Sequence, residues 1–108
     1  MQVVEVLADE GRVRVIRCVG DFDQGVLAPL AAACAAAADD DRVDKVVVDV
    51  SEVAFADSAF LNELLRLRRQ LPTVLAGPLP ARLLRLLELT GALGVFPLAD
   101  GVDAARAR

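Results

Sequence analysis

The hydrophobic and polar positions at the start of the chain predict two strands joined by a tight turn. Residues 2–8 alternate loosely between apolar and polar, and residues 12–19 do so again after Asp9-Glu10-Gly11. A short turn that contains glycine favours an antiparallel hairpin. Alternation breaks at Val15-Ile16, which indicates either a strand buried on both faces or a bulge.

The segment that follows is rich in alanine and predicts a thin helix over residues 26–38. A polar loop at 20–23 precedes this helix, and Pro29 is tolerable only in its first turn. The triplet Asp39-Asp40-Asp41 ends the helix, because acidic side chains oppose the dipole at a helix C-terminus. We expect this triplet to be a solvated loop rather than a phosphate or metal site.

The strongest strand signal lies in the middle of the chain. Residues 45–50 form a β-branched run, which is typical of a central parallel strand covered on both faces. The remaining predicted elements alternate: helix Ser58–Gln70, strand Thr73–Ala76, helix 81–90, edge strand 95–98 and helix 102–107. This order predicts a single α/β domain over residues 1–108, with a mixed sheet of four to five strands and about four helices.

Two predicted loops are expected to meet at one edge of the sheet. Right-handed crossovers bring the loop after Val19 and the loop after Val50 to the same edge of the sheet, at the carboxyl ends of the strands. Sites of α/β folds lie at that edge. We therefore expect a cluster of Asp21, Asp23, Asp57 and Ser58.

Several kinds of chemistry lack the residues they need. The chain has no histidine, no GxxxxGK[ST] or GxGxxG motif, and few aromatic residues, so we expect no catalytic residue, metal, cofactor or nucleic acid. Cys18 and Cys34 have no CxxC spacing and are expected in the core, although a disulfide between them stays open. The longest uncharged run, 24–38, is too short to span a bilayer.

A receiver-type phosphorylation site is a further alternative. Asp21 and Asp23 resemble its acid pair and Asp49 its phosphorylated residue. Such a site also needs a basic residue at the end of a later strand, but Thr73–Ala76 is followed by Gly77-Pro78. The sequence therefore disfavours this chemistry.

The formal net charge of −4 conceals an uneven distribution. Residues 1–57 carry 5 basic and 12 acidic side chains, and residues 58–108 carry 7 basic and 4 acidic ones. Either this difference gives the folded surface a dipole that steers a protein partner, or folding mixes the charges and removes it.

An ordered series of segments carries a resemblance to a known family. Gly20-Asp21-Phe22-Asp23 before an alanine-rich helix is similar to the opening motif of STAS domains, the sulfate-transporter and anti-sigma-factor-antagonist family. The segment 46–58 resembles that family's central strand and its Asp-Ser-Ser/Thr-Gly motif. Segments 75–78, 87–91 and 95–97 are similar to later landmarks in the same order. The resemblance covers nearly the whole chain and rests on this ordered spacing.

The resemblance implies a partner-switching module. In stand-alone members, the unmodified antagonist captures a serine kinase that also inhibits a sigma factor, and phosphorylation of the antagonist breaks the complex. The family's phosphoacceptor position is Ala59 here, which has no hydroxyl, and its glycine position is Phe60. We therefore expect this chain to escape phosphorylation at the usual position and to stay competent to bind.

The expected partner-binding residues are Asp21, Asp23, Asp57, Ser58, Ala59, Phe60, Leu61 and Asn62. The exposed side of helix Ser58–Gln70 could extend this surface. We interpret Ser58 as the N-cap of that helix rather than as a phosphoacceptor, with Asp57 as the alternative cap. Phe60 is interpreted as core packing rather than as an aromatic anchor for the partner.

The leading functional hypothesis is a cytoplasmic anti-sigma factor antagonist, without enzymatic activity, that binds a serine-kinase anti-sigma factor. Its leucine content permits a homodimer. The alternative is an accessory subunit of a lipid-transport ABC complex, because stand-alone STAS subunits of that kind have a similar length and fold. A small enzyme or nucleotide-binding protein is disfavoured by the missing histidine and phosphate loop.

Overall fold

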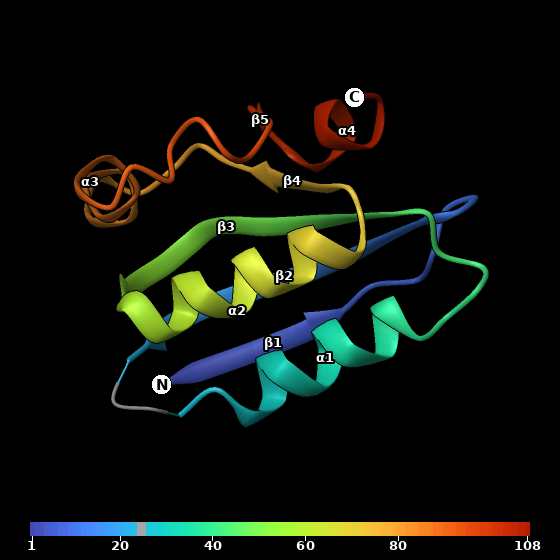
Figure 1. Ribbon diagram of the computed structural model, residues 1–108, viewed down its shortest axis with the longest axis horizontal. Coiled ribbons are helices and arrows are strands. Elements are labelled where there is room, and N and C mark those ends of the chain that lie inside the picture. The colour runs from blue at the N-terminus through green and yellow to red at the C-terminus, as the bar shows by residue number, and fades with distance from the viewer. Residues whose placement is uncertain (24–25) are drawn as a thin grey trace.

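The order of strands and helices follows the sequence-based prediction (Figure 1). The computed structural model describes residues 1–23 and 26–108. Within these ranges the strands are β1 Gln2–Val6, β2 Val13–Phe22, β3 Lys45–Ala56, β4 Thr73–Ala76 and β5 Leu98–Ala99. The helices are α1 Ala28–Ala38, α2 Ser58–Gln70, α3 Ala81–Leu89 and α4 Val102–Arg106. The predicted α/β class with a mixed sheet is confirmed.

The five strands of the described residues lie side by side in chain order, β1-β2-β3-β4-β5. β1 pairs with β2 in the antiparallel sense, which confirms the predicted hairpin, and the other three pairs are parallel. Val15 and Ile16 are both fully buried and belong to clusters on opposite faces of the sheet. Burial on both faces therefore explains the break in alternation at this point.

Several strand boundaries differ from the prediction, beginning with β1, which ends at Val6 rather than at Ala8. β2 continues through Phe22, so Asp21 is a strand residue and not part of a loop. β3 continues to Ala56, which leaves Asp49 inside the strand, where its carboxylate accepts a hydrogen bond from the Ser51 hydroxyl at 2.8 Å. Residues 20–22 belong to β2 because they pair with the end of β3, an interaction that local sequence does not encode. The last strand is Leu98–Ala99 rather than 95–98, because it pairs with the end of β4.

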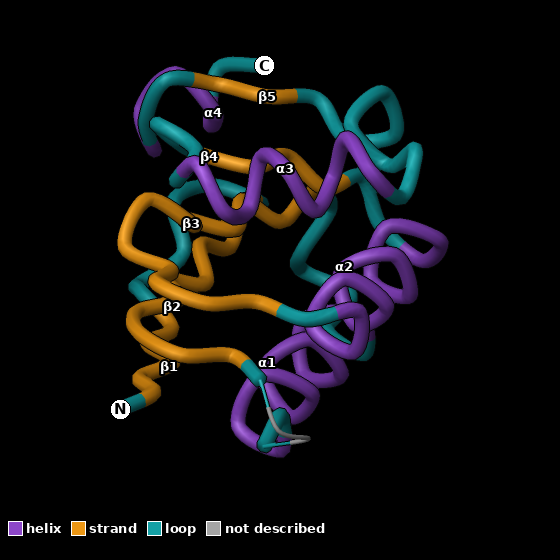
Figure 2. The backbone as a smooth tube through the Cα atoms, turned by 90° about the vertical axis from the view of Figure 1, so that its left-hand side faces the viewer, coloured by secondary structure: helices purple, strands orange, loops and turns teal. Residues whose placement is uncertain are grey.

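The helices are divided unequally between the two faces of the sheet. Figure 2 shows α1 and α2 side by side on one side of the strands. Apolar residues of α1, α2 and α3 share one core cluster with Val46, Val48 and Val50 of β3. Val47 points the other way and packs with Ala105 of α4. β3 is therefore the central strand covered on both faces that its β-branched run predicts.

Both cysteines are core residues, as expected, and neither forms a disulfide. Burial is the main cause that raises the pKa of the Cys18 thiol to about 12, and it raises that of Cys34 to about 12 as well. The thiols therefore stay protonated at neutral pH and behave as small apolar side chains.

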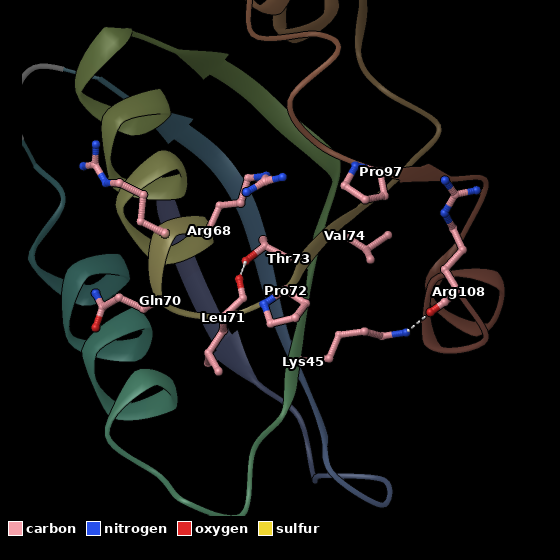
Figure 3. Close-up of a pocket in the computed structure, with 10 residues that line it drawn as sticks. Lys45, Arg68, Gln70, Leu71, Pro72, Thr73, Val74, Pro97 and Arg108 are labelled. Carbon is pink, nitrogen blue, oxygen red and sulfur yellow. Dashed lines mark hydrogen bonds between the residues drawn. The ribbon is translucent and has the colours of Figure 1, made fainter.

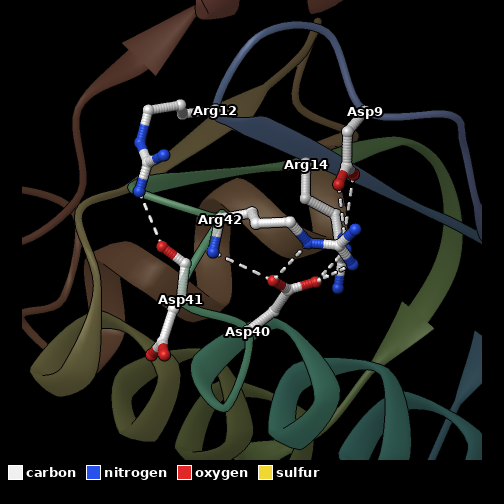
Figure 4. Close-up of polar contacts among 6 residues, drawn as sticks. All are labelled: Asp9, Arg12, Arg14, Asp40, Asp41 and Arg42. Atoms are coloured by element: carbon white, nitrogen blue, oxygen red, sulfur yellow. Dashed lines mark hydrogen bonds and ion pairs between the residues drawn. The ribbon is translucent and has the colours of Figure 1, made fainter.

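An ion-pair cluster near the start of β2 engages one residue of the acidic triplet, Asp40, whereas Asp39 and Asp41 are exposed as expected. Arg14 donates to both carboxylate oxygens of Asp9 at 2.9 Å and to Asp40 at 2.8 Å (Figure 4). Arg42 donates to the same Asp40 carboxylate at 3.1 and 3.0 Å. Asp40 is thus not a freely solvated loop residue, because it links the hairpin end of β2 to the loop after α1.

This cluster predicts a loss of stability in acid. Hydrogen bonds from Arg42 and Arg14 hold the pKa of Asp40 well below its usual range, and Arg14 lowers that of Asp9. A carboxylate whose pKa is lower in the folded state stabilises the fold above its unfolded pKa, about 3.9, and loses this contribution as the pH falls further. We expect urea denaturation to show a fall in unfolding free energy between pH values of about 5 and 2.

Asp40→Asn is the matched control, because it removes the main titrating group and keeps the shape. The variant should lose less stability than the wild type over the same pH range. An equal loss in both proteins would place the acid sensitivity elsewhere in the chain.

A second prediction concerns Gly20, which has a positive φ of 97°. A Cβ atom built at this position collides with the carbonyl oxygen of Met1, whose backbone pairs with β2 there. Gly20→Ala should lower the unfolding free energy by about 2 kcal/mol or more, since backbone strain and the clash add. Gly94→Ala is the control, because a Cβ there meets no atom within 4 Å. Similar losses in the two variants would contradict the prediction.

Candidate protein-binding site

The candidate site lies at the carboxyl edge of the parallel strands, where β2 ends and β3 passes into α2. Asp21 lies opposite Phe55 and Phe22 opposite Ala56 in the paired strands. The backbone N–H of Asp57 then donates to the carbonyl oxygen of Phe22 at 3.2 Å. This bond fixes the start of α2 against the end of β2, so the two acidic segments meet at one edge as expected.

Asp57, not Ser58, is the N-cap of α2. Its carboxylate accepts a hydrogen bond from the backbone N–H of Phe60 at 3.1 Å, and its extended backbone precedes the first helical residue. This arrangement satisfies a backbone donor in the first turn and places negative charge at the positive end of the helix dipole. The preferred expectation for Ser58 is therefore wrong, and the alternative cap holds.

Phe60 is a core residue. It is fully buried, and its ring centroid lies 5.1 Å from that of Phe22, also fully buried, at an interplanar angle of 50°. Leu61 is buried as well, with 4% of its surface exposed. Both side chains therefore pack α2 against the sheet and are not accessible to a partner. This confirms the core interpretation of Phe60.

The residues of this segment that reach the surface are few. Ser58 and Asn62 are exposed, whereas Asp57 and Ala59 are partly buried. Arg66 and Arg69 continue the exposed side of α2 at helical spacing. The exposed side of α2 is therefore polar and acidic near Asp57 and Ser58 and basic near Arg66 and Arg69.

Asp21 and Asp23 border the same edge. The Asp21 carboxylate lies 3.3 Å from the amino group of Met1 and is 42% exposed. Asp23 is partly buried, and its carbonyl oxygen accepts the backbone N–H of Val26 at 3.3 Å. Together with Asp57 they give the edge an acidic character, which favours a partner surface that is basic there.

Sequence analysis missed a neighbouring hollow of about 280 Å³, formed by Phe55, Ala56, Arg82, Arg85, Leu86 and Leu89. The Arg82 guanidinium carbon lies 4.4 Å from the centre of the Phe55 ring, which is 42% exposed. Leu89 is 73% exposed. Phe55 stands out in sequence as an apolar residue near a strand end, but only the tertiary fold places α3 beside it.

The described residues do not form a metal centre. Within residues 1–23 and 26–108, no three His, Cys, Asp or Glu side chains are grouped to hold a metal ion. The receiver-type alternative is also excluded by geometry, because Asp49 lies inside β3 and β1 is antiparallel to its neighbour. Among the described helices, none has the length and apolar character needed to cross a membrane.

Comparison with known proteins identifies the family. The family model described as "Mlab, STAS domain" matches residues 6–97 of this chain. The chain therefore belongs to the STAS domain family, as the ordered motifs predicted. No curated protein sequence matches it.

Solved structures give a consistent picture of the fold. An anti-sigma factor antagonist from Mycobacterium paratuberculosis is 28% identical, with a TM-score of 0.84 over 99% of this chain and 92% of that one. A STAS-domain anti-sigma-factor antagonist from Planctomyces limnophilus is 22% identical, with a TM-score of 0.73 over 96% of each chain. Phosphorylated SpoIIAA, the Bacillus cell fate determinant, is 19% identical, with a TM-score of 0.74 over 98% and 100%. These similarities establish the SpoIIAA-like architecture of this chain.

Proposed function

We propose that this protein is an anti-sigma factor antagonist whose partner docks on the carboxyl edge of the sheet. The surface comprises Asp21, Asp23, Asp57, the exposed Ser58 and Asn62, and Ala59 between them. The observation that carries the proposal is the Asp57-capped start of α2, in a chain so similar to the Mycobacterium antagonist. It is a regulatory binding role, without catalysis or a cofactor.

The proposed partner is a kinase-type anti-sigma factor. Phosphorylation of this chain at the family's usual position does not dissociate the complex. Ala59 occupies that position as the second residue of α2, and a methyl group cannot accept a phosphoryl group. Ser58 offers an exposed hydroxyl one residue earlier, but its place in the helix differs by about 100° from that of Ala59. A kinase arranged for the usual position therefore faces a methyl group.

The direct test combines capture of the partner with a mass measurement. The protein is used to pull down binding proteins from the native extract, and the captured ATPase is then incubated with it and Mg-ATP. We expect a sigma-factor-regulating kinase to be recovered and the intact mass to stay unchanged. A stoichiometric gain of about 80 Da, mapped to Ser58, would contradict the second part of the proposal.

Recovery of a transport ATPase with its membrane permease would overturn the antagonist proposal. It would support the role of accessory subunit in a lipid-transport ABC complex. The test therefore separates the two functions that a STAS domain of this length could serve.

Two matched variants localise the binding surface. Asn62→Asp adds negative charge near the start of α2, whereas Gln70→Glu makes the same amide-to-carboxylate change at the far end of α2, and both residues are exposed. We expect partner capture to fall with Asn62→Asp and to persist with Gln70→Glu. The opposite result would move the interface toward the other end of the helix.

A further inference from the structure

A basic pocket lies at the amino edge of the parallel strands, at the other end of β3 from the proposed partner surface. Its volume is about 680 Å³. It is lined by Lys45, Arg68, Arg69, Gln70, Leu71, Pro72, Thr73, Val74, Pro97 and Arg108. Lys45 begins β3, Thr73 begins β4, and Arg68 belongs to the last turn of α2. The proposed antagonist function does not use any of these residues.

Hydrogen bonds to backbone oxygens hold two of the cations in place. The Arg68 Nε donates to the carbonyl oxygen of Val95 at 2.7 Å, and the Lys45 Nζ donates to backbone oxygens of Arg106 and Arg108 at 2.9 Å each. Among the described residues, the two terminal nitrogens of Arg68 have no hydrogen-bond partner. The bond to Val95 thus orients the guanidinium, and its two terminal nitrogens stay available to donate to a ligand.

The charged side chains that line the pocket are all basic. Lys45, Arg68, Arg69 and Arg108 line it, and none of its described lining residues is acidic. Like charges that share a hollow repel one another, and a concave surface focuses their field on an anion. Three of the seven basic side chains of residues 58–108 therefore lie around this one pocket.

Apolar residues lie between the cations of the pocket. Figure 3 shows Arg68 and Arg108 on two sides of Val74 and Pro97, with Lys45 and Pro72 beside them. Val74 is buried, whereas Pro72 and Pro97 are exposed. Sites for small molecules have volumes of roughly 300–1,000 Å³ and combine apolar walls with a few placed charges.

We infer that this pocket binds a small organic phosphate. The dianionic group lies against Arg68, whose planar fork matches phosphate oxygens, and Arg108 adds positive charge from the other side of Val74 and Pro97. The apolar part of the ligand packs on Pro72, Val74 and Pro97. This site is independent of the partner surface, because the two lie at opposite ends of the twelve-residue β3.

The probe for this site is phenyl phosphate, which joins a dianion to an apolar ring. Titration of the isotope-labelled full chain, followed by amide and arginine Nε resonances, should shift signals at Leu71, Thr73, Val74 and the Arg68 side chain. Phenol and inorganic phosphate, each half of the probe, should bind more weakly than phenyl phosphate at the same residues. Shifts that gather at the Asp57 edge instead would overturn the inference.

Two variants and one control test the role of the cations. Arg68→Gln should weaken phenyl phosphate binding about tenfold, the loss expected for a charge-assisted hydrogen bond, and Arg108→Gln should also weaken it because it removes a positive charge from the pocket. Arg108→Gln keeps the test valid if Arg68→Gln weakens the fold through its lost bond to Val95. Arg66→Gln, on α2 but outside the pocket, should leave the affinity unchanged.

Unchanged affinity in both pocket variants would reject the site. So would binding of an acidic peptide to the pocket when phenyl phosphate does not bind. Asn62→Asp should leave phenyl phosphate binding intact, and Arg108→Gln should leave partner capture intact. Failure of the antagonist proposal is thus distinguishable from failure of this one.

Discussion

Replacing Phe60 by alanine should lower the free energy of unfolding by about 3–5 kcal/mol. The side chain is fully buried and packs against Phe22 with ring centroids 5.1 Å apart, so its removal leaves a cavity beneath the first turn of α2. Urea denaturation followed by far-ultraviolet circular dichroism measures this change. The loss is expected to be the largest among single substitutions in the candidate site, since Ser58, Ala59 and Asn62 are less buried.

Phe55→Ala is the matched control for this experiment. Phe55 is 42% exposed and touches Arg82 through its ring face, so its loss should cost about 1 kcal/mol or less. A stable Phe60→Ala protein that loses its partner would contradict the core assignment and make Phe60 an interface anchor. A large loss of unfolding free energy in Phe55→Ala would instead show that the contact between Phe55 and α3 stabilises the fold.

Ala59→Ser should restore phosphorylation control. With the proposed kinase and Mg-ATP, the variant is expected to gain one phosphoryl group, about 80 Da, and then to lose affinity for its partner about a hundredfold. A phosphate at this position adds up to two negative charges beside Asp57, at an edge that already carries Asp21 and Asp23. Repulsion and desolvation of that charge in the complex account for the expected loss.

The double variant Ser58→Ala, Ala59→Ser is the control that assigns the modified residue. It should be phosphorylated as readily as Ala59→Ser, whereas Ser58→Ala alone should stay unmodified. Intact-mass measurement and titration calorimetry of the modified and unmodified forms give both results. A phosphorylated Ala59→Ser protein that binds its partner as tightly as before would show that phosphorylation at this position does not control partner binding.

Elements with strong local signals follow the sequence closely. The β-branched run of β3 predicted a central buried strand, and the amphipathic helix Ser58–Gln70 has the predicted bounds. The apolar positions of α2 match the helical period, and the uninterrupted apolar run of β3 matches burial on both faces, so local preference and tertiary burial agree. The fold class and the family therefore followed from the order and spacing of such segments.

Elements whose limits depend on a neighbour did not follow the sequence. Asp21 and Phe22 extend β2 because the end of β3 pairs with them, although Gly20-Asp21-Phe22-Asp23 has the composition of a loop. The last strand shifted toward Leu98–Ala99 for the same reason. Backbone pairing partners come from distant parts of the chain, and residue type alone does not report them.

The candidate site divides in the same way. Sequence alone determined that Ala59 cannot accept a phosphoryl group, that histidine chemistry is absent, and that Asp57 and Ser58 start a helix, because these follow from side-chain chemistry. Only the tertiary structure decided that Asp57 is the cap, that Phe60 packs on Phe22, and that Arg82 of α3 lies over the Phe55 ring. It also gathered Arg68 and Arg108 around one pocket. Each of these depends on contacts between segments far apart in the chain, whose distances are set by packing and not by local composition.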